Sequence, residues 1–259
     1  MKTIFRPVRI LIVGASGGLG SALAHHYARP DMVLSLWGRD TARLASLAKA
    51  CETAGASVNV RSLDLSDVKG AVDAMLAEDE RSSFDLAIFA SGLGDIRATG
   101  TVVEDADLVA RLGTINFVAP AAMAAALAGR MAARGKGRIV LIGSAAAFHA
   151  LPFACAYSGT KAGLAHFAEA LRIGMQRHGV RIVLVSPGFI NTPAARQVHG
   201  SRPLSMQPAV AAAKIARAAA LGKAHVITPW PFSLLRWFDC LLPRPLREKL
   251  LLALSPPGG

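Results

Sequence analysis

The sequence predicts an α/β fold, a doubly wound parallel β-sheet covered by helices on both faces, followed by an amphipathic C-terminal helical tail. Short apolar runs alternate with longer segments of helical periodicity along most of the chain, which is the pattern of parallel strands joined by crossover helices. The first apolar run ends in a glycine-rich turn, residues 14–20, that opens directly into a helix. No linker rich in Pro, Gly or Ser divides the 259 residues. We therefore expect one domain over residues 1–228 and an apolar, amphipathic extension over residues 229–259.

The alternation assigns the strands and the helices between them. We expect strands at residues 8–13, 32–37, 57–63, 84–89, 138–142, 180–185 and 224–228. We expect helices directly after the glycine turn, around Tyr157, and at residues 41–54, 66–80, 104–134 and 208–221. Residues 194–207 are polar and irregular, and we interpret residues 189–207 as a lid.

The composition describes a chain that can fill a large core and that carries its charge unevenly. Hydrophobic residues make up 53% of the sequence, and the mean hydropathy is +0.40. The net charge is +12, and residues 108–259 hold 18 basic but only 3 acidic side chains. These basic residues are scattered among Ala-rich helices without a basic-aromatic stripe, so we expect no nucleic-acid partner. An anionic membrane surface, a phosphate-bearing ligand and an ordinary solvated surface are the remaining interpretations of the excess.

The cysteines and the apolar runs indicate the compartment. Cys51, Cys155 and Cys240 are odd in number and far apart, so neither a disulfide framework nor a metal site is indicated. The first seven residues are too short and too polar for a signal peptide, and no apolar run reaches the ~18 residues that would span a bilayer. We expect a cytoplasmic protein, with contact to the inner face of a membrane as a further hypothesis.

The glycine turn is the first candidate binding site. Its glycines, Gly14, Gly18 and Gly20, follow the spacing G-x-x-x-G-x-G. Glycines let backbone N–H groups approach a pyrophosphate, and the N-terminus of the following helix favours its negative charge. An ordinary glycine-rich turn is the alternative. If the turn binds a dinucleotide, the contacting residues are Gly14, Ser16, Gly17, Gly18, Leu19 and Gly20.

The end of the second expected strand bears on which dinucleotide would bind. In a nucleotide-binding βαβ unit this position lies beside the adenosine ribose, and a carboxylate there would select NAD. Here the position holds Trp37, and Arg39 follows where a guanidinium can meet a 2′-phosphate. The pattern favours NADP(H), with a surface-turn role for Arg39 as the alternative.

Two further turns follow expected strands at the edge where open α/β sheets bind ligands. Asp64 and Leu65 come after the third strand, where Asp64 can meet an adenine or act as a cap or turn residue. Ala90, Ser91 and Gly92 form a turn of small residues after the fourth strand. We assign both turns to the cofactor site.

The candidate catalytic pair is Tyr157 and Lys161. A spacing of four residues puts both side chains on one face of a helix. An ammonium beside a phenol favours the phenolate, so the tyrosine can exchange a proton at neutral pH and act as a general acid. Ser144 ends the fifth expected strand and places a hydroxyl at the same edge of the sheet. Asn116 lies among apolar neighbours in the helix before that strand, either as a satisfied core amide or as the holder of a water in a proton path.

Taken together, these motifs resemble those of the short-chain dehydrogenase/reductase family over about residues 8–228. The resemblance is carried by the order and spacing of Gly14, Gly18, Gly20, Asn116, Ser144, Tyr157, Lys161 and Pro187-Gly188. It implies a Rossmann-type fold, a seven-stranded doubly wound sheet that binds a nicotinamide dinucleotide. It also implies a homodimer or a homotetramer.

The resemblance also implies roles for individual residues. Tyr157 would donate a proton to the carbonyl oxygen of the substrate, and Lys161 would lower the pKa of Tyr157 and hold the nicotinamide ribose. Ser144 would orient the substrate oxygen, and Asn116 would carry the water of a proton relay.

After the sixth expected strand, the family pattern places the nicotinamide site. By the same resemblance, Pro187 and Gly188 belong to the cofactor site, and Ile190 and Thr192 would contact the nicotinamide carboxamide. The chain departs from the family at Val13, where Thr is common, and at residues 89–92, Phe-Ala-Ser-Gly, where Asn-Asn-Ala-Gly is common. Both departures affect turn support and remove no catalytic group.

We therefore expect an NADPH-dependent oxidoreductase that reduces a ketone to an alcohol. One alternative is an NAD-dependent alcohol dehydrogenase working oxidatively, which the missing acid at Trp37 disfavours. Another is a non-catalytic dinucleotide sensor or scaffold, which has no need of the Asn, Ser, Tyr and Lys set. Residues 145–153 are nearly all apolar, so the expected substrate is apolar, with an acyl-chain or other lipid-like ketone as the favoured class.

The tail supports the same expectation about the substrate. Apolar residues recur there with helical spacing, basic residues are interspersed, and Pro243 and Pro245 break the pattern. The tail resembles an interfacial helix that is too short and too charged to span a bilayer. The alternative is that it packs over the active site or at a subunit interface.

Overall fold

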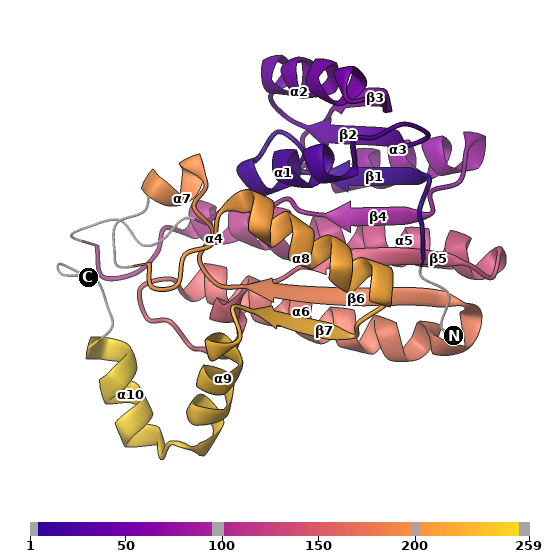
Figure 1. Ribbon diagram of the computed structural model, residues 1–259. Helices are drawn as coiled ribbons and strands as arrows, with labels where there is room; N and C mark the ends of the chain where they lie inside the picture. The colour runs from indigo at the N-terminus through magenta and orange to yellow at the C-terminus, as the bar shows by residue number, and fades with distance from the viewer. Residues whose placement is uncertain (1–4, 95–100, 198–201, 254–259) are drawn as a thin grey trace.

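Seven parallel strands form one sheet at the centre of the molecule, and helices cover both of its faces (Figure 1). The structure is a computed structural model that describes residues 5–94, 101–197 and 202–253. The strand order is β3-β2-β1-β4-β5-β6-β7, so the direction of strand addition reverses between β1 and β4. Ligands of open α/β sheets bind at the carboxyl ends of the strands at such a reversal. The strands are β1 (Arg9–Val13), β2 (Val33–Gly38), β3 (Ser57–Ser62), β4 (Leu86–Phe89), β5 (Gly137–Ile142), β6 (Val180–Pro187) and β7 (His225–Thr228).

The helices divide between the two faces of the sheet (Figure 1). One face packs against α1 (Gly18–Tyr27), α2 (Thr41–Thr53) and α8 (Pro208–Leu221). The other face packs against α3 (Val68–Arg81), α5 (Ala119–Ala133) and α6 (Cys155–Met175). The remaining helices are α4 (Ala106–Gly113), α7 (Pro193–Gln197), α9 (Pro231–Leu241) and α10 (Arg244–Ala253).

The central strands are apolar on both sides because both faces are covered. In β1, Ile10 and Ile12 belong to the core on the α1/α8 side, and Leu11 and Val13 belong to the core on the α3/α5 side. Side chains of a strand alternate between the faces, so a strand between two helical layers has a continuous apolar sequence. The Rossmann-type sheet expected from the sequence is confirmed, and every strand end lies within two residues of its predicted place.

The single helix predicted over residues 104–134 is wrong in one respect. The structure has α4, then a π-helical turn at Thr114–Val118, then α5. A π turn inserts one extra residue into the helical ladder and is often found at functional sites. Periodicity does not reveal such a turn because the apolar residues on either side continue at helical spacing.

The continuous helical segment Ala106–Ala133 also corrects the expectation about membrane spans. Among the described residues, it is the one helix long and apolar enough, by length and composition, to cross a bilayer. Just over half of its apolar window, 56%, is buried inside the protein, and α5 packs on the sheet with α3 and α6. Core helices of this kind meet the same length and composition test.

The lid region is more regular than the sequence suggests, and the tail forms two helices. Residues 194–207, predicted as irregular, include most of the short helix α7, while residues 198–201 lie outside the described part of the chain. The tail forms the two helices α9 and α10, separated at Pro243 as predicted, whereas Pro245, expected to break the pattern as well, lies in the first turn of α10, where proline is tolerated. Figure 1 shows this hairpin projecting from the body below β7.

Candidate active site

The glycine turn between β1 and α1 lies against the segment that follows β4. Gly14 has a φ of +87°, and a Cβ at this position would lie 2.6 Å from the backbone nitrogen of Ser91, so only glycine fits. The N–H groups of Gly14 and Ala15 both donate to the Trp37 carbonyl at 2.8 Å. At Gly20 a Cβ would collide with the Gly14 carbonyl. These close approaches bring β1, β2 and β4 together at the reversal point of the sheet.

A cavity opens at this point between the glycine turn, the end of β2 and the loops after β3 and β4. Predicted cofactor residues among its lining residues are Gly14, Ser16, Gly17, Arg39, Leu65, Ala90, Ser91 and Gly92. Trp37, Leu63, Leu93 and Ile115 also line it. Gly18, Leu19 and Gly20 form the first turn of α1 next to this cavity.

The end of β2 presents an arginine and no carboxylate to the cavity. Trp37 is fully buried, and its Nε1 donates to Ser35 Oγ at 2.9 Å. Strand β2 continues to Gly38, one residue beyond the expected end. Arg39 follows as an exposed residue on the rim of the cavity. A guanidinium in this position can pair with a phosphate group.

Asp64 has the turn role that was one of its two predicted alternatives. Its Oδ1 accepts a hydrogen bond from the Ser66 backbone N–H at 2.9 Å, and the side chain is exposed. This hydrogen bond is the main cause of a lowered pKa at Asp64; burial opposes it, and the Ser66 side chain and the charge of Arg39 lower the pKa further. Leu65 lines the cavity and Asp64 does not.

The residues present fit the adenosine and pyrophosphate portion of a nicotinamide dinucleotide. The glycines allow the turn to fold tightly against neighbouring backbone, with the N-terminus of α1 directly after it, and the turn lines the cavity. Ser91 Oγ is buried at the cavity and has no hydrogen-bond partner among the described residues. A buried hydroxyl without a partner is costly unless a ligand satisfies it.

The catalytic candidates gather at the adjacent strand end. Ser144 follows β5 and caps a 3-10 turn at Ala145–Phe148, where its Oγ accepts from the Ala146 N–H at 3.1 Å. Ser144 is also hydrogen-bonded to Tyr157 in the first turns of α6. One turn further along α6, the Lys161 Nζ donates to the Ile142 carbonyl at 3.0 Å.

The electrostatics of this cluster differ from one expectation. Burial raises the pKa of Tyr157 above its usual value, and the hydrogen bond with Ser144 opposes that shift. Burial lowers the pKa of Lys161 to about 8, and this side chain is only 4% exposed. The lowered pKa of Tyr157 that the sequence predicts is therefore not seen, because the desolvation of the phenol outweighs the effects that favour the phenolate.

Asn116 lies in the π turn and braces the segment after β4. Its Nδ2 donates to the Leu93 carbonyl at 2.9 Å, and its Oδ1 accepts from the Leu93 N–H at 2.8 Å. A Cβ at Gly92 would lie 3.3 Å from Lys161 Nζ and 3.4 Å from Asn116 Oδ1, so these groups lie close together. Asn116 is thus a satisfied buried amide, the first of its two predicted alternatives, and its water-holding role stays a prediction.

The predicted nicotinamide residues lie on the other side of the glycine turn. Gly188 follows Pro187, which ends β6, and Ile190 forms an isolated bridge with Met206. The Thr192 Oγ1 accepts from the Ala195 N–H at 3.1 Å and so begins α7. A Cβ at Gly18 would lie 2.9 Å from Thr192 Cβ, which shows that this segment touches the glycine turn.

Two residues near the site were missed by sequence reasoning. Glu104, expected to begin the long helix, precedes it, and its Oε2 accepts from the Ala156 N–H at 2.7 Å. This bond caps the N-terminus of α6 directly before Tyr157. Phe232 in α9 packs its ring against Gly188. Neither contact has a local sequence signal, because each joins segments more than 40 residues apart.

Comparisons with known proteins agree with this geometry. The family model for short chain dehydrogenase matches residues 9–202. An oxidoreductase of Myxococcus xanthus is 29% identical over 237 residues, covering 91% of this chain and 93% of the relative.

Two solved structures match nearly the full length. The bulky-bulky ketone specific alcohol dehydrogenase from Comamonas testosteroni superposes with a TM-score of 0.78 at 25% identity, covering 98% of this chain and 96% of the other. A short-chain dehydrogenase from Sphingobium yanoikuyae in complex with NADPH has a TM-score of 0.79 at 25% identity, covering 97% and 98%. The chain belongs to the short-chain dehydrogenase/reductase family and is an oxidoreductase acting on CH–OH and C=O groups.

Proposed function

We propose that the protein reduces an apolar ketone to the alcohol with NADPH. The observation that carries the proposal is the placement of Ser144 beside Tyr157, with the buried Lys161 one turn further along α6, at the strand ends that adjoin the cavity. When bound, NADPH supplies a hydride. The Tyr157 hydroxyl donates a proton to the carbonyl oxygen, and the Ser144 hydroxyl holds that oxygen by a hydrogen bond.

Reduction requires the protonated form of Tyr157. Burial raises its pKa, so the hydroxyl keeps its proton at neutral pH and can donate it to a substrate oxygen. The hydrogen bond to the Ile142 carbonyl holds Lys161 in position. Below pH about 8, most Lys161 side chains in the folded protein are charged. The ammonium helps to stabilise negative charge on Tyr157 after the proton has left.

NADPH is proposed over NADH because of the residues on the cavity rim. No carboxylate is available at Trp37 to read ribose hydroxyls, and Arg39 is exposed at the rim. The neighbour from Sphingobium yanoikuyae is described with NADPH bound, which supports the same choice.

An apolar substrate is proposed because aromatic rings surround the catalytic strand ends. Phe148 ends the turn that Ser144 caps, and the Phe189 ring lies 6.3 Å from that of Phe232. The neighbour from Comamonas testosteroni is described as specific for bulky ketones. We further propose a cytoplasmic homodimer or homotetramer that touches the inner face of a membrane.

A homologous series of ketones tests the proposal. If the chain of the substrate is buried at ~0.8 kcal/mol per methylene, kcat/KM should rise about fourfold for each added CH₂ until the apolar surface is filled. The loss of NADPH absorbance gives the rates. Kinetics that do not change with chain length would contradict the apolar substrate, and equal KM values for NADPH and NADH would contradict the choice of cofactor.

A further inference from the structure

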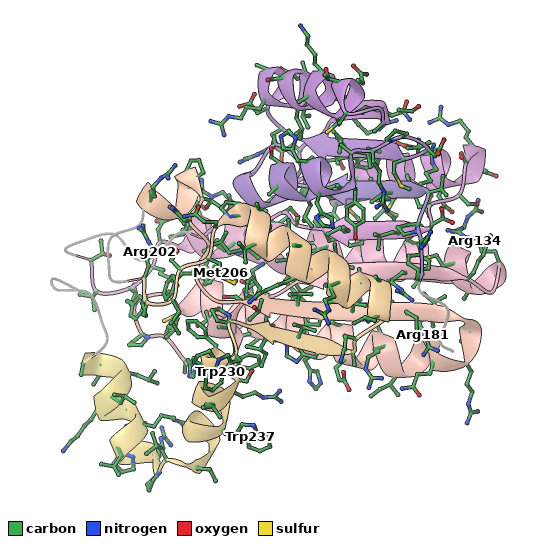
Figure 2. All side chains as sticks on the ribbon, viewed as in Figure 1. Arg134, Arg181, Arg202, Met206, Trp230 and Trp237 are labelled. Atoms are coloured by element: carbon green, nitrogen blue, oxygen red, sulfur yellow. The ribbon has the colours of Figure 1, made fainter. Side chains whose placement is uncertain are left out.

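Helix α9 carries an apolar stripe that faces away from the body of the protein. The stripe consists of Trp230, which directly precedes the helix, and Leu234, Trp237 and Leu241 within it; these side chains are 70%, 50%, 66% and 77% exposed. Their spacing of four, three and four residues puts them on one face of the helix. Figure 2 shows Trp237 on the outer side of α9, pointing away from α10. Large aromatic side chains in such a row are unusual on a surface that only water contacts.

A different side of α9 is anchored beside the catalytic residues. Phe232 is 8% exposed and packs against Gly188, near the ring of Phe189. The Arg236 guanidinium lies over the Phe148 ring, 5.1 Å from its centroid. We call Phe148, Phe189 and Phe232 the aromatic wall. One side of α9 therefore contacts the aromatic wall, and another side carries the exposed stripe.

Helix α10 adds cations next to further exposed apolar residues. Leu246 and Leu250 are 56% and 49% exposed and four residues apart. Arg247 and Lys249 lie on either side of this second apolar row at helical spacing. The whole chain has a net charge of +12, so a negatively charged surface attracts it from a distance.

We propose that the α9–α10 hairpin docks on an anionic membrane surface and that the aromatic wall receives apolar substrate from that membrane. The row of tryptophan and leucine on α9, together with the leucines flanked by Arg247 and Lys249 on α10, matches the boundary between lipid headgroups and acyl chains. An anionic membrane satisfies both the apolar rows and the cations. The substrate half of this proposal rests on the proposed function, whereas the docking half stands without it.

Vesicle flotation of the full-length, NADPH-loaded protein tests the docking. The variant Trp237→Glu/Leu241→Glu places two charges on the stripe, and Val210→Glu places one on exposed α8 as a control. We expect the wild type and the control to float with vesicles of phosphatidylcholine and phosphatidylglycerol. The double variant should bind them roughly tenfold or more weakly, because two large apolar side chains leave the interface. Vesicles of phosphatidylcholine alone should bind the wild type less.

Two results would overturn the docking. One is a wild type that stays unbound to anionic vesicles. The other is a double variant that floats as well as the wild type. If neither protein binds vesicles and the double variant has a smaller mass in sedimentation than the wild type, the stripe is instead an interface with a second copy of the chain.

Turnover separates the two halves of the proposal. The double variant should keep its rate with a short, water-soluble ketone, since Trp237 and Leu241 lie on a different side of α9 from Phe232, and should lose rate with a long-chain ketone held in anionic vesicles. Equal losses with both ketones would overturn delivery from the membrane. Flotation without reduction of any ketone would leave the docking supported and would refute the proposed function.

Discussion

Replacing Lys161 by methionine should stabilise the protein at neutral pH while it weakens cofactor binding. Lys161 is 4% exposed, and burial lowers its pKa from 10.5 to about 8. At pH 7 the ammonium is charged in both the folded and the unfolded chain, so the folded state carries the cost of burying it. Methionine has a similar volume and no charge. The substitution leaves the Ile142 carbonyl without its donor, which offsets part of the gain.

The magnitude follows from the difference between the two pKa values. Because the folded pKa is the lower one, the unfolded chain binds more protons between pH about 8 and pH 10.5, and the wild type gains stability as the pH rises through that range. Methionine at this position does not titrate. The stability advantage of the variant should therefore shrink by about 2–3 kcal/mol between pH 7 and pH 10.

Urea unfolding followed by circular dichroism measures this change in both proteins at each pH. Taking the difference between wild type and variant removes the titration of all other groups that the substitution leaves undisturbed. An advantage that stays constant from pH 7 to pH 10 would refute the reasoning, since it would mean that Lys161 titrates alike in the folded and unfolded chains.

Three further predictions concern single residues and pH. Arg39→Ala should raise the KM for NADPH by about tenfold or more and leave that for NADH little changed, whereas Arg43→Ala, which removes an exposed arginine paired with Asp40, should alter neither. Glu104→Ala should lower the free energy of unfolding by about 1 kcal/mol and also lower kcat, because the start of α6 loses its cap beside Tyr157. The control Asp105→Ala, which uncaps α4, should lower the free energy of unfolding by a similar amount and leave kcat unchanged. The rate of reduction at low NADPH should fall as the pH rises through about 8, where Lys161 loses its proton in the free enzyme, and a profile flat to pH 10 would exclude this role.

The sheet could be predicted because its signal is local. An apolar run such as residues 9–13, followed by a glycine turn, indicates a buried strand and a turn in almost any protein, since strands covered on both faces must be apolar on both faces. The glycine spacing and the Tyr157–Lys161 pair likewise lie within short segments. Their positions at one edge of the sheet follow from the parallel arrangement.

The rest depends on contacts between distant segments. The π turn at Asn116 is stabilised by the backbone of Leu93, and no pattern within residues 104–134 indicates it. The pKa of Tyr157 depends on how deeply the surrounding chain buries it, so the tyrosine–lysine spacing alone gave the wrong direction. Glu104 and Phe232 reach the site from segments whose folding partners the sequence does not indicate.

The most direct test of the account is the NADPH-dependent reduction of a long-chain ketone by the purified wild type and by Tyr157→Phe. Phenylalanine keeps the ring of Tyr157 and removes the hydroxyl that bonds to Ser144. The account predicts that the variant still binds NADPH, as followed by cofactor fluorescence, and turns over ~10²–10⁴-fold more slowly, which is the usual contribution of a positioned acid. A variant that keeps most of its turnover, or a wild type that oxidises no NADPH with any ketone of the series, would contradict it.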